Sequence, residues 1–506
     1  MPKRPALVFL ALVIVAAAGA CIVVRQHEVD TLDPGRRVVV ETPVKAHLRD
    51  GSVIVFPEGA AVTRDSITGN GEKYDALRRP AGSSRGAALN DVVGAEAYSV
   101  GASEGKTLAY SGLALATLPL FKVAFGSCPT VYSDSAGVPV LETESFSYSI
   151  SPLLAKRDVD RLRAQPDSAG VVRLEVRNEA LETHYIDHLE LLEVRHRPDE
   201  TVYPAAYGHP LAFREAMPPV TAHDRGGRNV RGLIGYVDDA SFASSEATLR
   251  DATDADPVDW IDMTLPPPAS DSTALLLRVR SSLLTTLLFY DHMLARPGAH
   301  SLDWMATDLS RILTVAGFGR WYAGNLGLRV QVLENGKYRQ VARLADFGPI
   351  AWRHVGVMIP SPGTDSLRVR LEFTADQWRI DQVNVAAARR VRPRSLPLAR
   401  VRTGTGDLVE PARDRMASAD DGYLTTQPSQ RFHAEFDAGH ADEPRTFLLA
   451  AHGYYVEWVR GEWLSESTGT EAFDPDKVRM GAVLREWRAA RDSMERAFFN
   501  TRVPVL

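Results

Sequence analysis

The sequence predicts a mainly β protein: a small β-barrel or β-roll, then tandem antiparallel β-sandwich lobes with inserted helices and a C-terminal helix. Segments in which apolar and polar residues alternate, such as Val172 to Arg177 and Leu367 to Phe373, recur along the chain. This period of two is typical of half-buried strands. Asn335-Gly336, inside the segment from Leu328 to Leu344, is the strongest hairpin signal, because it tolerates the positive φ values of a type I′ turn. Strands at this spacing favour antiparallel sandwiches over a parallel α/β sheet.

Composition limits the classes of protein that fit. The chain has 506 residues, which is long enough for three or four domains. Its residues are 45% hydrophobic and 24% charged, which is typical of a folded protein. The formal net charge of −6 gives no general attraction to nucleic acid or to an anionic membrane surface. The only two cysteines, Cys21 and Cys128, cannot form a disulfide framework or a cysteine-rich zinc site.

Residues 1–25 are predicted to be a signal or anchor segment. An unbroken apolar stretch from Ala6 to Val24 follows Lys3 and Arg4. As a helix it would span about 28 Å, at roughly 1.5 Å per residue, which is close to the hydrocarbon thickness of a bilayer. The basic residues before it favour a cytoplasmic amino terminus, with the rest of the chain exported. Cys21 ends an Ala-Gly-Ala-Cys sequence similar to a bacterial lipobox, so it is either a lipid-attachment residue or part of an uncleaved signal anchor.

Residues 37–100 are expected to form the small β-module. Strands are predicted on both sides of Asp50-Gly51, a turn at Gly69-Asn70-Gly71, and another strand from Leu89 to Tyr98. The connector 101–127 contains a second apolar stretch, Thr107 to Phe125, which predicts a buried or membrane-lying helix. No Lys or Arg cluster follows it to favour a second membrane crossing.

Residues 128–400 are expected to hold the sandwich lobes and residues 401–506 the C-terminal strands and helices. Other predicted elements are helices at Leu283–Leu294 and Trp304–Val315, a linker or long loop at 386–420, and strands at Trp378–Val383, Arg431–Phe436 and Thr446–Ala450. The last helix is expected to begin with Asp474 as N-cap and Pro475 at its first position. Its apolar stripe, which we expect to contact the core, consists of Met480, Val483, Leu484, Trp487, Met494 and Phe498.

Two sequence patterns resemble catalytic or metal-binding motifs. Gly101-Ala102-Ser103-Glu104-Gly105 matches a nucleophile elbow, but no βα units precede it, so a flexible joint is the better interpretation. His184 and His188 have the spacing of helical zinc ligands, yet the apolar pattern around them predicts a strand. On a strand they would share a face but stand about 13 Å apart, at ~3.3 Å per residue, too far for one metal.

Acidic and aromatic groups give weaker signals. The acidic run of Asp251, Asp254, Asp256 and Asp259 lacks the glycine and the final glutamate of an EF-hand, so it is predicted to be a solvated loop. An aromatic group is predicted to seal a core, with a sugar-stacking platform as the alternative: Tyr454, Tyr455, Trp458 and Trp463. The sequence fixes no separation for Glu142 and Glu144, so no glycosidase pair follows. No pattern predicts a catalytic residue, a metal or a cofactor; P-loop and Rossmann fingerprints are both missing.

Five segments in a fixed order resemble a group of uncharacterised bacterial cell-envelope (lipo)proteins. They are Ser127–Tyr132 (SCPTVY), Asn178–Asp187, Trp378–Asp381 (WRID), Gly453–Trp458 (GYYVEW) and Met494–Asn500 (MERAFFN). The likeness covers most of the chain from the first β-module onward. It implies export and a shared architecture, and it transfers no activity.

Together these observations predict a membrane-anchored envelope protein that acts as a binding or scaffolding module. Its partners would be the membrane, through the N-terminal segment, and another envelope protein or glycan, but no nucleic acid. The alternatives are a hydrolase acting on an envelope polymer and an envelope assembly factor.

Overall fold

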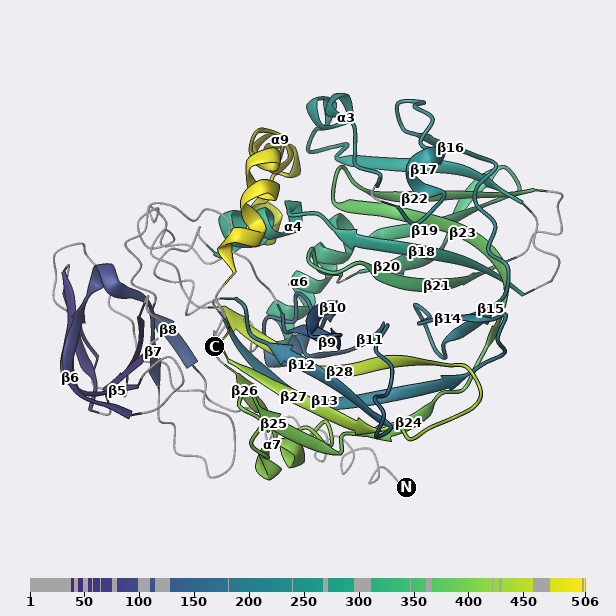
Figure 1. Cartoon of the computed structure of the whole chain (residues 1–506). Helices are drawn as coiled ribbons and strands as arrows, with labels where there is room; N and C mark the ends of the chain where they lie inside the picture. The colour runs from purple at the N-terminus through teal and green to yellow at the C-terminus, as the bar shows by residue number, and fades with distance from the viewer. Residues whose placement is uncertain are drawn as a thin grey trace, which may run out of the picture.

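The computed structural model describes residues 38–40, 44–48, 53–56, 58–63, 65–74, 80–98, 110–113, 128–180, 182–238, 240–266, 272–294, 311–345, 347–360, 366–420, 422–426, 430–457, 474–502 and 505 (Figure 1). Over these residues the chain forms an N-terminal β-module, two antiparallel β-sandwiches and a C-terminal helix. The mainly β fold class predicted from the sequence is therefore confirmed.

The N-terminal module is one eight-stranded sheet, in which β1 and β8 are the last strands at either edge. Its strands are β1 Val38–Val40, β2 Val44–Leu48, β3 Val53–Phe56, β4 Ala60–Val62, β5 Ser66–Tyr74, β6 Pro80–Ala88, β7 Val92–Tyr98 and β8 Tyr110–Leu113. β2 and β3 pair antiparallel, as predicted. Over the described residues the sheet does not close into a barrel.

Two predictions in this module are wrong. Gly69-Asn70-Gly71 is not a turn but lies inside β5. A Cβ atom on either glycine would come within 2.8 Å of the Phe56 ring, so these glycines make room for a buried side chain. The helix expected over 101–127 is not formed at Tyr110–Leu113, which pair with β7 as β8; a short apolar run does not distinguish a strand from a buried helix. The other residues of that connector lie outside the described part of the chain.

The first sandwich packs two sheets face to face. One has the order β10-β9-β12-β27-β25, and the other has β11-β28-β13-β24 with β26 paired to β13. The strands are β9 Thr130–Ser135, β10 Val138–Glu144, β11 Lys156–Arg161, β12 Val171–Arg177, β13 Glu182–Arg195, β24 Arg394–Pro397, β25 Arg400–Thr403, β26 Leu424–Thr426, β27 Arg431–Asp437 and β28 Arg445–Glu457.

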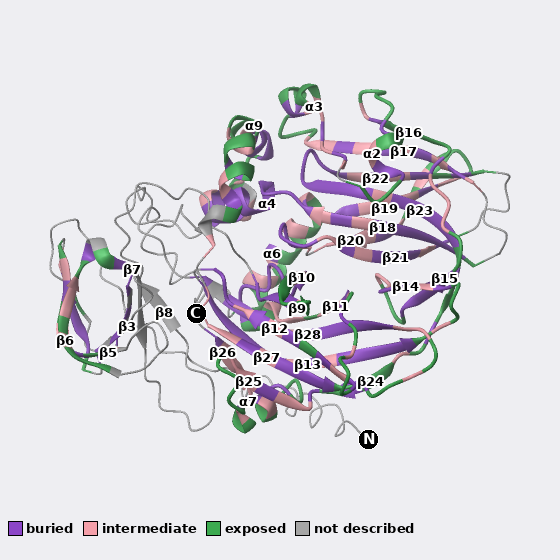
Figure 2. Ribbon diagram, in the orientation of Figure 1, coloured by how far each residue is buried: buried purple, intermediate pink, exposed green. Residues whose placement is uncertain are grey.

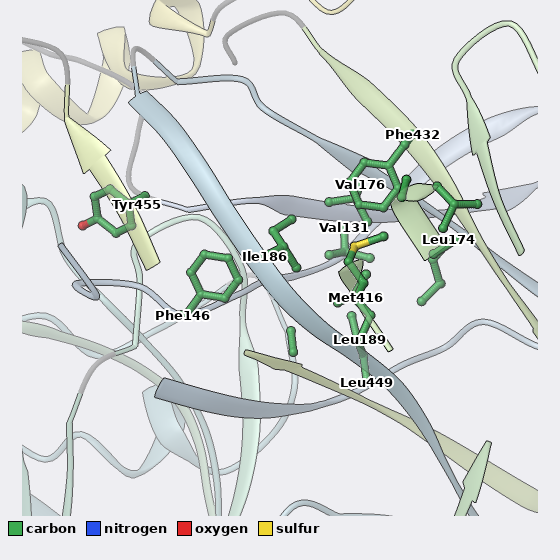
Figure 3. Packing of buried hydrophobic residues seen from close by; sticks show 14 of the residues in the cluster. Val131, Phe146, Leu174, Val176, Ile186, Leu189, Met416, Phe432, Leu449 and Tyr455 are labelled. Carbon is green, nitrogen blue, oxygen red and sulfur yellow. The ribbon is translucent and has the colours of Figure 1, made fainter. Parts of the chain in front are cut away.

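The inward-facing residues of β12, whose alternation was predicted, form one side of this core. Val172, Leu174 and Val176 are buried, and they share an apolar cluster with inward residues of β13 and β28. Figure 3 shows Phe146 and Tyr455 together at one end of the cluster, beside Ile186.

The second sandwich is inserted between β13 and β24. Its sheets have the orders β14-β15-β23-β18-β21 and β16-β17-β22-β19-β20. The strands are β14 Thr201–Tyr203, β15 Leu211–Phe213, β16 Thr221–Asp224, β17 Val258–Leu265, β18 Thr273–Ser281, β19 Leu328–Glu334, β20 Lys337–Leu344, β21 Arg353–Ile359, β22 Leu367–Thr374 and β23 Trp378–Arg390. The predicted hairpin joins β19 and β20, with φ of 50° at Asn335 and 77° at Gly336.

The linker or long loop predicted at 386–420 is wrong. Within this segment β24 pairs with β13, β25 pairs with β27, and α7 Glu410–Arg415 follows. Its content of Arg, Pro and Gly predicted a linker or long loop, but the arginines alternate with buried residues such as Val401 and pair with carboxylates across the sheet. For example, Arg400 Nε lies 2.8 Å from Glu435 Oε2. Strands on both sides of residue 400 therefore share the first sandwich.

Several short helices lie between the strands of the second sandwich along the chain. α2 Arg231–Ile234 and α3 Glu246–Asp251 were not predicted, whereas α4 Leu284–Leu287 and the π-helical turn Leu288–Leu294 match the predicted helix at 283–294. Of the helix predicted at Trp304–Val315, residues 304–310 lie outside the described part of the chain, and Ile312–Val315 form the first turn of α6 Ile312–Asn325.

The C-terminal helix, α9 Met480–Ala497, begins later than predicted. Asp474 instead closes a separate 3-10 turn, Pro475–Lys477, by accepting the Lys477 N–H. The expected core contact is confirmed, because all six stripe residues are buried and join a cluster with α3 and α4. Figure 2 shows the opposite side of the helix exposed.

No helix within the described ranges is both long and apolar enough to cross a membrane. The predicted anchor from Ala6 to Val24, with Cys21, lies outside those ranges.

Candidate functional site

His184 and His188 both lie on β13, as predicted, but on opposite faces of it. The pairing of β13 with β28 shifts between Ile186 and His188, and a bulge of this kind reverses the alternation of side chains beyond it. His184 is fully buried whereas His188 is only half-buried. The shared face expected from an unbroken strand is therefore wrong, and the two imidazoles do not converge.

His184 belongs to a buried polar group that we call the Cys128 cluster: Cys128, Glu144, Ser147, Glu182 and His184. The Cys128 N–H donates to Glu182 Oε1 at 2.5 Å, and His184 Nε2 lies 2.7 Å from the same oxygen. The Cys128 Sγ atom is 3.1 Å from Ser147 Oγ and 3.5 Å from Glu144 Oε2. The cluster thus joins three separate segments of the first sandwich.

Burial decides the protonation states in the Cys128 cluster. It raises the pKa of the Cys128 thiol well above its ordinary value, an effect reinforced by Glu144 and Glu182, so this thiol is not an activated nucleophile. Burial lowers the pKa of His184 to about 3, against an opposing effect of Glu457. A neutral imidazole beside a carboxylate donates from Nε2, which makes Nδ1 the unprotonated nitrogen.

Glu144 links the two sandwiches. Its Oε1 accepts the N–H groups of Ile350, at 2.9 Å, and Ala351, at 3.2 Å, just before β21. Burial raises the pKa of Glu144 to about 7, although these two N–H groups and Arg353 favour the charged form. Gly348 is required beside it, because a Cβ atom there would lie 2.2 Å from the carboxyl carbon.

Ion pairs reinforce the same junction. Arg353 on β21 pairs with Asp160 on β11 and lies 3.3 Å from Asp158. Removing one member of such a buried group would leave an uncompensated charge. The Cys128 cluster and these pairs therefore hold the two sandwiches together.

A second buried network centres on Asp376, which we call the Asp376 cluster: Ser244, Asp376, Arg379, Trp487 and Glu495. Asp376 has a left-handed φ of 59° and is fully buried. Its carboxylate accepts the Ser244 N–H at 2.9 Å, Arg379 Nη1 at 2.8 Å and the Trp487 indole N–H at 2.8 Å. Arg379 Nη2 also donates to Glu495 Oε1 at 2.6 Å. The cluster thereby fixes α9 to the second sandwich.

An open cavity of about 420 Å³ lies over the Asp376 cluster, between the second sandwich and α9. We call it the α9 pocket. It is lined by Arg228, Leu233, Ser241, Ala243, Ser244, Ser245, Glu246, Arg379, Arg491, Asp492 and Glu495. Three guanidinium groups and three carboxylates thus face one cavity. The pocket is concave, as small-molecule sites are, but its lining is mostly polar, with Leu233 and Ala243 as its apolar residues.

The guanidinium groups of the α9 pocket are held in place by neighbouring carboxylates. Arg228 Nε donates to Asp224 at 2.9 Å, and the Arg491 guanidinium lies 3.5 Å from Asp376 and 3.8 Å from Glu246. Ser245 caps α3 by accepting the Thr248 N–H. These contacts fix the lining without filling the cavity.

The remaining sequence candidates do not converge on one site. Ser103 lies outside the described residues, as do Trp458 and Trp463. Tyr454 and Tyr455 are buried, which confirms for these two the predicted sealing role; Tyr454 stacks on Tyr185 at 4.5 Å. The acidic run has separate partners: Arg250 for Asp251, the Gly481 N–H for Asp254, Arg225 for Asp256 and Ser244 for Asp259.

The segments that carry the resemblance meet in two places. Cys128, Glu182 and Glu457 come from three of them, with Glu182 directly opposite Glu457 across β13 and β28. Arg379 and Glu495 come from the other two and form a direct ion pair. Sequence reasoning did not identify Arg228, Ser241 and Glu246: the first two lie in loops before and after α2, and Glu246 begins the unpredicted helix α3.

Comparison with known proteins does not assign the chain to a family. No family model matches the chain, and no curated protein matches it. Among solved structures, one similar chain is the GH31 alpha-xylosidase Xac1773 from Xanthomonas citri, at 11% identity and a TM-score of 0.15. That match covers 82% of this chain and 38% of the xylosidase chain. A likeness at that TM-score carries no argument about fold or activity.

Proposed function

We propose that this protein is a membrane-anchored envelope protein that acts as a binding or scaffolding module, with the α9 pocket as its ligand site. The pocket carries the proposal, because its three guanidinium groups are held by buried carboxylates such as Asp376 while about 420 Å³ stays open. Groups that are ordered before the ligand arrives lose less entropy when it binds.

Features of the sequence support the location. The apolar stretch from Ala6 to Val24 is the proposed tether, and the chain after it is the exported part. The partners would be the membrane, through this stretch, and another envelope protein or a glycan. The net charge of −6 does not favour nucleic acid.

The chemistry of the pocket lining favours binding over hydrolysis of an envelope polymer by a serine or cysteine nucleophile. The lining contains neither His nor Cys. Its Ser244 hydroxyl donates to Asp259 at 2.6 Å and accepts the Asp376 N–H at 2.7 Å, so its hydrogen bonds are made within the protein. Glu144, whose pKa of about 7 would suit a general acid, does not line the pocket, and both of its oxygens contact protein groups.

Occlusion of the pocket tests the proposal. Ser241→Trp places a large ring in the lining, whereas Ser418→Trp adds the same ring at an exposed position in the first sandwich. We expect crosslinking in intact cells to capture a specific envelope component with the wild type and with Ser418→Trp, but not with Ser241→Trp. Equal capture by all three would contradict a binding role for the pocket. Turnover of an envelope polymer by purified wild type that Ser241→Trp abolishes would establish the enzyme alternative.

A further inference from the structure

We infer that the α9 pocket takes a neutral, polyhydroxylated ligand: a short stretch of an uncharged envelope glycan. This inference rests on the proposed binding function and goes beyond it by naming the class of ligand. It follows from three properties of the pocket: its size, its balance of charge and its pattern of donors and acceptors.

The size of the pocket limits the ligand to a small unit. Small-molecule sites run from about 300 to 1,000 Å³, and the 420 Å³ of the α9 pocket falls near the lower end of that range. One or two sugar rings, or a comparable end of a longer chain, match this volume. A folded protein partner would need a far larger surface, on the order of 800 Å² per side.

Its balance of charge disfavours an ionic ligand. The three lining guanidiniums belong to Arg228, Arg379 and Arg491, and the three carboxylates to Glu246, Asp492 and Glu495. These groups also pair with one another, as in Arg379 with Glu495 at 2.6 Å. An anion in the pocket would be repelled by the carboxylates, and a cation would be repelled by the guanidinium groups. All of these groups line one cavity, so each lies within a Debye length, about 8–10 Å, of a bound ligand. A ligand of either sign would thus gain attraction and repulsion together.

The donors and acceptors that face the cavity suit hydroxyl groups. Carboxylates only accept hydrogen bonds and guanidiniums only donate them, whereas a hydroxyl does both. The carboxylates keep accessible oxygens, since the side chains of Asp492 and Glu495 are 72% and 42% exposed. Neighbouring hydroxyls on a sugar can therefore donate to Asp492 or Glu495 and accept from Arg228 or Arg491 without separating the existing ion pairs. Leu233 and Ala243 add a small apolar wall for the face of a ring.

The test uses the full-length protein in mild detergent and three probes. These are the neutral and the acidic oligosaccharide fractions released from the envelope of the producing cells, and a set of lysine-containing dipeptides as the cationic probe. Binding is measured by saturation-transfer NMR and by calorimetry at 50 and 500 mM salt. We expect the neutral fraction alone to bind, with less than a twofold change in affinity between the two salt concentrations.

Variants tie that binding to the pocket. Asp492→Ala should weaken binding of the neutral fraction at least tenfold, and Ser241→Trp should abolish it. Asp251→Ala, which removes an exposed carboxylate at the end of α3 outside the pocket, should leave it unchanged. Circular dichroism of each variant checks its fold.

Three results would overturn the inference: binding of the acidic fraction or the dipeptides that Ser241→Trp abolishes, neutral binding that survives Ser241→Trp, or failure of the neutral fraction to bind. If pocket-dependent capture in cells persists in these cases, the binding function stands and only the ligand class is wrong. If neither the neutral fraction binds in the pocket nor a component is captured through it in cells, both the ligand class and the binding function are wrong.

Discussion

Glu144 gives the most quantitative prediction, because one buried carboxyl joins the two sandwiches and has a pKa of about 7 against 4.5 when exposed. Between these values the folded protein holds a proton that the unfolded chain releases. Stability from this group is therefore present below pH 4.5 and is lost as pH rises through 7. The difference of 2.5 pKa units corresponds to about 3 kcal/mol at 1.36 kcal/mol per unit.

Glu144→Gln should remove that loss while keeping the junction. The amide oxygen can occupy the place of Oε1, which accepts both the Ile350 and the Ala351 N–H, and the NH₂ group then faces the Cys128 sulfur. We expect the free energy of unfolding of Glu144→Gln, relative to the wild type, to rise by about 3 kcal/mol between pH 4.5 and pH 8. Glu144→Ala should be destabilised at every pH, because it leaves two buried N–H groups unbonded.

Urea unfolding at half-unit steps of pH from 4.5 to 8 measures this difference. Buried histidines act in the opposite direction. The pKa of His184 and that of His354 are lowered to about 3 by burial, so stability from each is lost as pH falls from 6.5 toward 3. Both contributions are shared by wild type and variant and cancel in the difference. A constant difference between the two proteins across the range would refute the reasoning about Glu144.

Three further predictions concern the junction, α9 and the tether. Gly348→Ala should cost about 1–3 kcal/mol of stability by overpacking against Glu144, and thermal unfolding should show less of that cost in the Glu144→Ala background; an equal cost in both would contradict the contact. Removal of residues 474–506 should cause aggregation or a much lower melting temperature, since full burial of Trp487 alone is worth about 2–3 kcal/mol; unchanged melting would show that α9 does not pack on the body. Metabolic labelling with a fatty acid should mark the membrane-bound protein and be lost in Cys21→Ala if Cys21 is the lipid-attachment residue, whereas an intact amino terminus would establish the uncleaved signal anchor.

The strands were predictable where the signal was local. Asn335-Gly336 favours a tight turn whatever surrounds it. In β12 and β22, buried and more exposed residues alternate because one face of each strand packs on the core, and this alternation is visible in the sequence. The segment 386–420 failed because its arginines meet carboxylates distant in sequence, such as Glu435. Composition reports charge but not the partner that neutralises it.

The site was less predictable than the fold. Arg379 and Glu495 lay in segments singled out for their resemblance, yet nothing in the sequence shows that they form an ion pair beside a cavity. Asp376 illustrates why the site could not be predicted. It accepts hydrogen bonds from Ser244 and from Trp487, which are far from it in sequence, and the Trp487 contact depends on how α9 packs on the second sandwich. The opposite faces of His184 and His188 likewise depend on a bulge that only the pairing with β28 reveals.

The central claim is that the protein binds an envelope component in the α9 pocket, and site-specific photo-crosslinking in living cells tests it most directly. A photoreactive amino acid is placed at Leu233, which lines the pocket and is not a proposed hydrogen-bonding residue, or at Gly232, the preceding residue on α2, which is exposed, lies outside the pocket and points roughly 100° away. We predict a discrete adduct from position 233 and none from position 232, and Ser241→Trp should remove the adduct. Equal adducts from both positions, or an adduct at 233 that persists with Ser241→Trp, would contradict the account.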